Sequence, residues 1–178
     1  MKKLKLPLTS EQIKEIKAGD VVYLTGEVYT ARDCAHKRIF ELLDEGRDLP
    51  FEIDGATFFY AGPCPAKEGM ACGSCGPTTS SRMQSFAPRL LDLGLKCIIG
   101  KGEMDEATYA ALKRNCACYF AAIGGAGALY GSKVKKSELV AFPELLSEAV
   151  YRFYIEDFPV VAAADCEGNR VFAVKETL

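Results

Sequence analysis

The chain has 178 residues and a mass of 19.4 kDa, which suits one domain spanning residues 1–178. Apolar residues make up 49% of the sequence and charged residues 26%, so a large core is available, and disorder, collagen and coiled coil are excluded. The 22 Lys and Arg against 24 Asp and Glu give a net charge of −2, which excludes an overall electrostatic footprint for nucleic acid or an anionic membrane. Any anion site must be local.

Neither a membrane span nor a secretory signal is visible in the sequence. The longest weakly polar stretch, residues 119–130, is about twelve residues long and contains three glycines, which is too short and too flexible to cross a bilayer. The first residues, MKKLKLPLTSEQ, have isolated leucines but no continuous apolar run after the basic residues. We therefore expect a cytoplasmic protein that does not associate with a membrane.

Cysteine is abundant, but a large core without a secretory signal favours reduced thiols over disulfides. Several of the eight cysteines lie in apolar runs, where a free cysteine packs as a small hydrophobe. Cys72 and Cys75 form a C-x-x-C, which is typical of half a zinc site or of a redox pair. Because Cys116 and Cys118 are only one residue apart and Cys64 lies at no standard spacing, the second half is missing, and no metal site is predicted on this chain.

The first part of the chain predicts helix, strand and helix in turn. Thr9 and Gln12 form a T-x-x-Q capping box for a short helix, and Gly19 is placed to end it. VVYLT, residues 21–25, predicts a strand. A second helix is expected to begin near Thr30 and to end at Gly46, because apolar residues recur between them at helical spacing.

The middle of the chain continues the alternation of strands and helices. The order expected is a strand at 56–62, an aperiodic Gly, Pro and Cys loop, a helix over 78–94 bent or interrupted by Pro88, a buried strand ending at the GKG turn, and a helix over 104–115. The alternation indicates parallel pairing of the strands.

The last part of the chain is rich in strands. Apolar runs predict strands at 118–125, 148–158, 159–166 and 170–174, the last two joined by a turn over 166–169. The fold class predicted is α/β, with a central parallel sheet, helices on one face and a second β layer.

Four polar or basic segments follow predicted strands and contain or adjoin glycine, where ligands bind in open α/β sheets. They are residues 30–33, 76–83, 100–102 and 124–127. Glycine loops can offer backbone N–H groups to an anion, and the hydroxyls from Thr78 onward can bind a ligand or simply cap a helix. Arg32 and Arg82 are compatible with anion binding or with a solvated helix face. Lys101, between two glycines, has no helix face to solvate.

His36 is the single histidine of the chain and has no clear Asp partner, so the sequence does not indicate a hydrolytic triad. It falls within the first turns of a predicted helix. A packing or capping role is the favoured interpretation for this side chain.

Five segments, taken in order, carry a family resemblance: TARDCAHKRI, GPCPAKEG, GSCGPTTSSRM, GKGEM and the late YIEDFP, VVAAAD and EGN run. Over residues 19–172 the chain resembles the β subunit of the iron-sulfur hydro-lyases, the group of class I fumarate hydratase and L-tartrate dehydratase. The resemblance implies a swivelling β/β/α three-layer domain that completes an active site. It also implies a partner α subunit, in a hetero-oligomer, that holds a 4Fe-4S cluster.

By motif position, the resemblance implies that Arg32, Arg82 and Lys101 bind the carboxylates of a dicarboxylate substrate and that Thr78 is the catalytic base. Guanidinium groups suit carboxylates, and cations near the carbon that loses its proton stabilise the transition state. Activation of a threonine as a base is not visible in the sequence. The expected function is reversible hydration of fumarate to L-malate. The alternatives are an L-tartrate dehydratase β subunit, a non-catalytic swivelling domain that binds a small anion, and a metal or redox protein built on Cys72 and Cys75.

Overall fold

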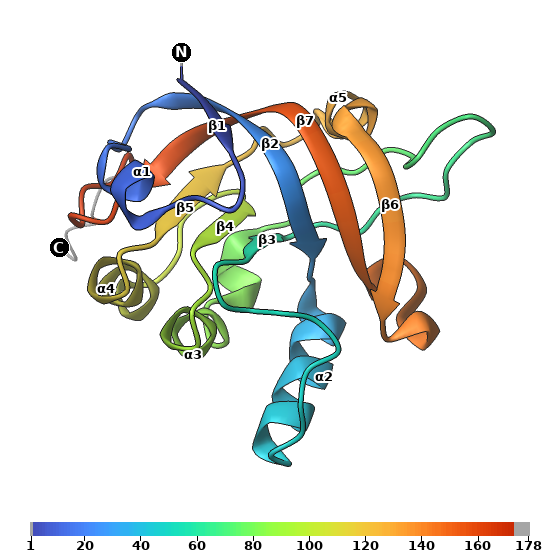
Figure 1. Ribbon diagram of the computed structural model, residues 1–178, viewed down its shortest axis with the longest axis horizontal. Helices are drawn as coiled ribbons and strands as arrows, with labels where there is room; N and C mark the ends of the chain where they lie inside the picture. Colours follow the sequence, from blue (N-terminus) through green and yellow to red (C-terminus); the bar gives the residue numbers. More distant parts are fainter. Residues whose placement is uncertain (1, 173–178) are drawn as a thin grey trace, which may run out of the picture.

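The computed structural model in Figure 1 describes residues 2–172. Its strands are β1 (Lys2–Lys5), β2 (Val21–Thr30), β3 (Thr57–Phe59), β4 (Cys97–Gly100), β5 (Cys118–Ala121), β6 (Val134–Ala141) and β7 (Val150–Ala164). The α-helices are α1 (Ser10–Lys14), α2 (Asp33–Asp44), α3 (Ala87–Asp92), α4 (Glu106–Arg114) and α5 (Gly127–Lys133), with 3-10 turns η1 (Ser80–Met83) and η2 (Pro143–Glu148). No helix within residues 2–172 is long and apolar enough to cross a membrane.

The strands form one seven-stranded sheet in the order β1-β2-β3-β4-β5-β7-β6. The pairs from β1 to β5 are parallel, as the alternation of strands and helices predicted, whereas β7 pairs antiparallel with β5 and β6. An additional antiparallel pairing of β2 with β7 joins β2, β3, β4, β5 and β7 into a closed ring. The fold is therefore mixed α/β, and the antiparallel strands β6 and β7 belong to the same hydrogen-bonded sheet as the parallel strands.

Two apolar clusters lie on the opposite faces of this sheet because side chains alternate along each strand. Inside the ring, Leu24, Ile99, Phe120 and Phe158 belong to one cluster. On the outer face, α2, α3 and α4 cover a second cluster to which β3, β4 and β5 contribute Phe58, Ile98 and Tyr119. All four residues of β4 are buried, which is usual for a parallel strand covered on both sides.

The start of the chain follows the predicted order of helix, strand and helix, but α1 ends at Lys14 rather than at Gly19, and the boundary between β2 and α2 is also shifted. The Thr9 and Gln12 capping box is present at α1. The helix expected from Thr30 begins at Asp33 instead, because β2 continues through Thr30 and the Ala31 N–H donates to the Phe59 carbonyl at 3.0 Å. The extra strand residues are retained in the sheet by pairing with β3 and β7.

The helix expected over 78–94, bent or interrupted at Pro88, forms only in part. The Thr78 N–H donates to the Tyr60 carbonyl at 2.7 Å and the Ser80 N–H to the Lys101 carbonyl at 2.9 Å, so this segment is tied to neighbouring strand ends before any helix can form. Only the short turn η1 and then α3 follow. Pro88 lies in the first turn of α3, where its missing N–H costs nothing.

The C-terminal strands also differ from the expectation. Residues 148–158 and 159–166 were expected as separate strands, but β7 is one strand with a positive φ of 46° at Asp157. The sequence pattern did not predict β1, α5 or β6. β6 is an edge strand whose middle residues are exposed and largely charged, so it lacks apolar alternation. Arg170 makes an isolated bridge with Ala164, and residues 173–174 of the last expected strand lie outside the described residues.

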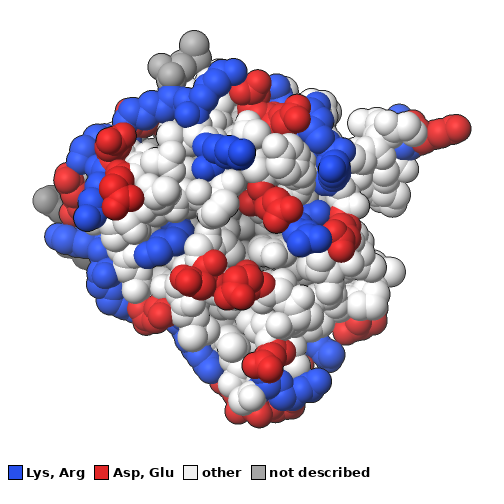
Figure 2. Space-filling model, in the orientation of Figure 1, with Lys and Arg blue, Asp and Glu red and all other residues white. Residues whose placement is uncertain are grey.

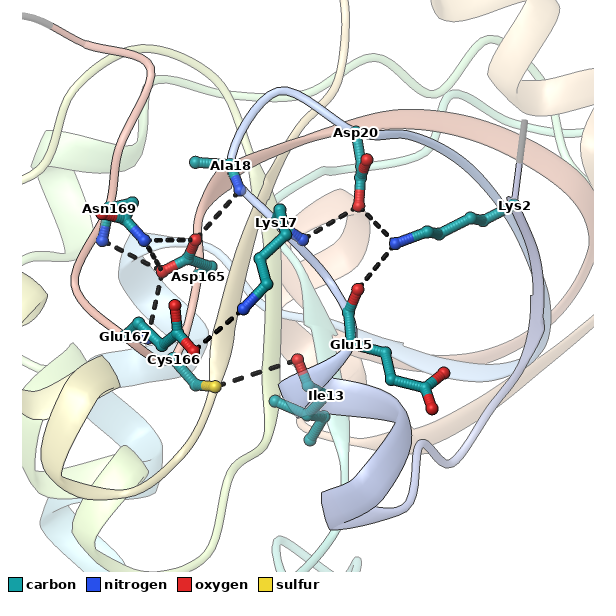
Figure 3. A network of polar contacts seen from close by, with 10 residues as sticks. All are labelled: Lys2, Ile13, Glu15, Lys17, Ala18, Asp20, Asp165, Cys166, Glu167 and Asn169. Atoms are coloured by element: carbon teal, nitrogen blue, oxygen red, sulfur yellow. Dashed lines mark hydrogen bonds and ion pairs between the residues drawn. The ribbon is translucent and has the colours of Figure 1, made fainter.

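The turn expected over 166–169 is present, and a buried carboxylate organises it (Figure 3). Asp165 accepts hydrogen bonds from the backbone N–H groups of Ala18, Glu167 and Asn169 at 3.0–3.1 Å. Burial opposes ionisation, but these bonds and the Asn169 side chain lower the pKa of Asp165 below its ordinary value. The end of β7 is thereby joined to the loop that precedes β2.

Candidate functional site

The carboxyl ends of the parallel strands bring the basic segments together. Thr30, Phe59 and Ile99 lie side by side in the register of β2, β3 and β4. Arg32 and Lys101 each follow two residues after an aligned position, and the glycine loop 124–127 follows β5. The topology thus brings these segments to the same edge of the sheet.

The segment Thr78–Ser80 crosses this edge between β3 and β4. Thr79 pairs with Lys101 in a parallel bridge, and Ser80 Oγ accepts hydrogen bonds from the Lys101 N–H at 3.0 Å and the Tyr119 hydroxyl at 2.9 Å. A Cβ on Gly100 would lie 1.9 Å from Ser80 Oγ, so the close approach requires glycine. Thr78, half-buried, is held through its backbone to the end of β3.

Arg82, in η1, is held by the first residue of α2. Its Nε donates to Asp33 Oδ1 at 2.9 Å, which joins the 76–83 segment to the 30–33 segment. The Arg82 side chain is 49% exposed, so its guanidinium remains accessible. Because η1 is a single 3-10 turn, Arg82 does not lie on the face of a regular helix.

Arg32 lies at the N-cap of α2 and is less exposed than Arg82, with 24% of its side chain accessible. Its Nη2 is 3.4 Å from Glu148 Oε1, and the other oxygen of Glu148 accepts from the Cys34 N–H at 3.0 Å. Burial opposes ionisation of Glu148, but the Cys34 hydrogen bonds and the Arg32 charge lower its pKa below the ordinary value. A Cβ on Gly62 would lie 3.1 Å from Arg32 Cδ, so glycine makes room for the arginine.

Lys101 differs from the two arginines in its electrostatic surroundings. Within residues 2–172, no carboxylate oxygen lies within the 4.0 Å of an ion pair to its ammonium group, whereas Arg32 and Arg82 each have one. Its side chain lies beside Gly124, where a Cβ would be 3.5 Å from Lys101 Cδ. Lys101 is therefore the cation of this edge whose charge no neighbouring acid offsets.

The surface charge agrees with a local site. In Figure 2 the Lys and Arg side chains are interspersed with Asp and Glu over the face shown, without a continuous field of one sign. Attraction of an anion to this chain would therefore depend on the few cations at the strand ends.

His36 is fully buried beneath the same edge and packs against aromatic rings. Its Nδ1 lies 2.8 Å from the Arg32 carbonyl, and its ring centroid is 5.3 Å from those of Tyr60 and Phe86. Burial lowers the pKa of His36 to about 4, so the ring is neutral at pH 7. These contacts fit a packing role for His36 on the buried face of α2, which is the role that the sequence favoured.

Cys72 and Cys75 lie in the long segment between β3 and η1. Both are buried within the inner cluster, and all eight cysteines are free thiols. In the part of the chain from 2 to 172, no three His, Cys, Asp or Glu side chains are arranged to hold a metal ion. The cysteines of this chain thus do not fit an iron-sulfur cluster, which needs at least three thiolates in one place.

Sequence reasoning missed the residues that hold the arginines. Asp33 stands next to Arg32, so the sequence indicated its place at the edge of the sheet. Its contact with Arg82 had no signal in the sequence. Glu148 and Gly62 had no signal, because only the packing of η2 against α2 and the loop after β3 brings them to Arg32.

Comparisons with known proteins place the chain in a family. A family model described as Fumarase C-terminus matches residues 1–175. A putative L(+)-tartrate dehydratase subunit beta of Methanocaldococcus jannaschii is 37% identical over 93% of this chain and 88% of that protein. The L(+)-tartrate dehydratase subunit beta of Escherichia coli K12 is 34% identical over 100% of this chain and 90% of that protein.

Longer proteins match as well. Fumarate hydratase 2 of Leishmania major is 36% identical over 96% of this chain, but the match covers only 31% of that protein. The chain therefore corresponds to a whole β subunit in some relatives and to about a third of a longer polypeptide in others. Because the family model matches almost the full length of this chain, the chain belongs to the Fumarase C-terminus family.

Proposed function

We propose that this chain is the β subunit of a class I fumarate hydratase, which catalyses reversible hydration of fumarate to L-malate together with an α subunit in a cytoplasmic hetero-oligomer. The observation that carries the proposal is the gathering of Arg32, Arg82 and Lys101 at the carboxyl ends of β2, β3 and β4, on a chain of this family. The mixed α/β fold supports a swivelling β/β/α three-layer domain that would close over the partner.

The three cations suit a four-carbon dicarboxylate. The guanidinium groups of Arg32 and Arg82 can each bind a carboxylate through two N–H groups, while the Lys101 ammonium acts as a point charge. Loss of a proton from the carbon next to a carboxylate builds negative charge on that carboxylate. Lys101, whose charge no acid of the described chain offsets, is the group best suited to stabilise that charge.

Thr78 is proposed as the base that removes this proton in the dehydration direction. Its backbone bond to Tyr60 and the Thr79 bridge to Lys101 fix its place at the strand edge. A threonine hydroxyl has a high intrinsic pKa and requires an activating partner. The α subunit is the proposed source of that partner.

The 4Fe-4S cluster of the proposed enzyme would be held by the α subunit. This chain offers no three-thiolate site within residues 2–172, and its buried Cys97 and Cys118 have thiol pKa values raised by desolvation, which disfavours the thiolate form that iron requires. When bound to the partner, such a cluster supplies an iron that accepts the leaving hydroxyl. The proposed role of the present chain is to bind and orient the dicarboxylate and to supply Thr78 as the base.

An L-tartrate dehydratase β subunit is the second candidate. Two relatives named as L(+)-tartrate dehydratase β subunits match this chain over 88% and 90% of their own lengths, so nearly all of each of these β subunits corresponds to it. Fumarate and tartrate are both dicarboxylates, and the cations described here suit either. Tartrate carries one hydroxyl more than L-malate, and the groups that read it are proposed to lie on the α subunit.

The test is reconstitution with the α subunit under anaerobic conditions. We expect the present chain alone to be inactive, and the pair to hydrate fumarate and dehydrate L-malate, with activity lost on exposure to oxygen. Turnover of tartrate but not of fumarate would establish the second candidate. Binding of dicarboxylates without turnover by the pair would support the anion-binding domain, and a cluster assembled on this chain alone would contradict the subunit assignment.

A further inference from the structure

The carboxylate of Asp33 lies between the two arginine-bearing segments. Its Oδ1 accepts from Arg82 Nε at 2.9 Å, while its Oδ2 is buried and has no hydrogen-bond partner within residues 2–172. Asp33 is the first residue of α2, and its side chain is 22% exposed. The residue thus presents one oxygen to the guanidinium and leaves the other without a protein partner.

The ion pair between Asp33 and Arg82 adds little to the stability of the fold. Arg82 is half exposed, and ion pairs with an exposed partner contribute little to the free energy of folding. A buried carboxylate oxygen without a partner opposes folding, because it has lost its water. The pair is therefore better explained by what it does to Arg82 than by what it adds to the fold.

The geometry of arginine gives that explanation. A guanidinium has its N–H donors in a rigid planar fork, so fixing the Nε edge also fixes the direction of the two Nη groups. Asp33 occupies the Nε of Arg82 and leaves both Nη groups free of acidic partners among the described residues. We propose that Asp33 is a positioning residue that orients the Nη pair of Arg82 for bidentate binding of one substrate carboxylate, an inference that rests on the proposed function.

The test compares Asp33→Ala with Asp33→Asn in the reconstituted pair. Asp33→Ala removes the acceptor, so Arg82 must be ordered at each binding event, and we expect KM to rise about tenfold with kcat within about twofold. Asp33→Asn keeps an oxygen in the place of Oδ1, so KM should return to within about threefold of the wild-type value. Damage to the fold alone would reduce the amount of active enzyme and leave KM unchanged.

Asp44→Ala is the matched control. Asp44 is at the other end of α2 and pairs with Arg89 in an exposed ion pair, so its loss removes a similar contact far from the strand edge. We expect wild-type kinetics for this variant. A KM for Asp33→Ala equal to the wild-type KM, or a failure of Asp33→Asn to restore it, would overturn the positioning role.

A measurement independent of turnover separates this inference from the proposed function. In the assembled pair, with only the present chain labelled with ¹⁵N-arginine, the Arg82 Nε–H signal should be protected from exchange in the wild type and in Asp33→Asn, and exposed in Asp33→Ala. Equal protection in the wild type and Asp33→Ala would refute the positioning role, even in an active enzyme. A pair that shows the expected protection but turns over none of fumarate, malate and tartrate would refute the function and leave the Asp33 contact established.

Discussion

Replacing Arg82 by lysine separates a binding role from a structural one. Arg82 uses Nε to hold Asp33 at 2.9 Å and has two Nη groups remaining for a carboxylate. A lysine has one ammonium group, which can contact Asp33 or the substrate in good geometry, but cannot reproduce the fork that reaches both. We therefore expect Arg82→Lys to lower kcat/KM at least tenfold, which corresponds to a loss of about 1.4 kcal/mol of transition-state stabilisation.

The effect on stability should be smaller than the effect on catalysis. Because the Arg82 side chain is 49% exposed, its ion pair with Asp33 is expected to contribute about 0–1 kcal/mol to the free energy of unfolding. Urea unfolding of the variant should give a midpoint close to that of the wild type. Steady-state kinetics of the reconstituted pair on fumarate and on L-malate provide the value of kcat/KM.

Arg114→Lys is the control for this experiment. Arg114 is 48% exposed and also donates from Nε to an aspartate, Asp92 at 2.8 Å, but it lies on α4 away from the strand ends. Its replacement should leave kcat/KM unchanged. Unaltered kinetics for Arg82→Lys, or an equal loss in both variants, would refute the binding role of Arg82.

Three further predictions concern the same edge of the sheet. Lys101→Ala should raise KM for the dicarboxylate and lower kcat, because no neighbouring acid offsets the charge that is lost; normal values of both would return Lys101 to a structural role. Gly100→Ala should destabilise the chain by about 1–3 kcal/mol in urea unfolding, since the new Cβ would lie 1.9 Å from Ser80 Oγ; an unchanged midpoint would contradict the contact. His36 should make stability depend on pH. Burial holds its folded-state pKa at about 4, below the unfolded value near 6.5, so its contribution is complete above pH 6.5 and is lost as the pH falls toward 4. We expect a loss of about 2 kcal/mol in the free energy of unfolding between pH 7 and pH 5, and an imidazole that titrates near 6.5 in NMR spectra of the folded protein would refute the burial.

Local patterns in the sequence predicted the elements whose signals are carried by neighbouring residues. The capping box at Thr9 depends on a partner three residues away, and the buried strand of β4 is a continuous apolar run between turn signals. The placement of Arg32 and Lys101 at one edge followed from the same local signals, because parallel strands present their carboxyl ends together. These features needed no knowledge of distant contacts.

Elements that depend on distant partners were not predicted. β6 has a mostly exposed and charged sequence and is a strand because β7 pairs with it. The α-helix expected from Thr78 begins only at Ala87, because the N–H groups of Thr78 and Ser80 bond to residues that directly follow β3 and β4 rather than within a helix. In both cases the backbone hydrogen bonds are made with another segment of the chain, and the periodicity within the segment itself has no information about them.

The sequence by itself determined the fold class, the edge of the sheet that bears the cations and, through its motifs, the family. The tertiary structure decided which acid faces which cation: Asp33 on Arg82, Glu148 on Arg32, and none among the described residues on Lys101. It also decided that β2 and β7 pair and close the ring of strands. The physical reason is the same for both. The ion pairs and the pairing of β2 with β7 join segments that lie apart in the sequence, and the periodic pattern of one segment does not indicate which other segment it contacts.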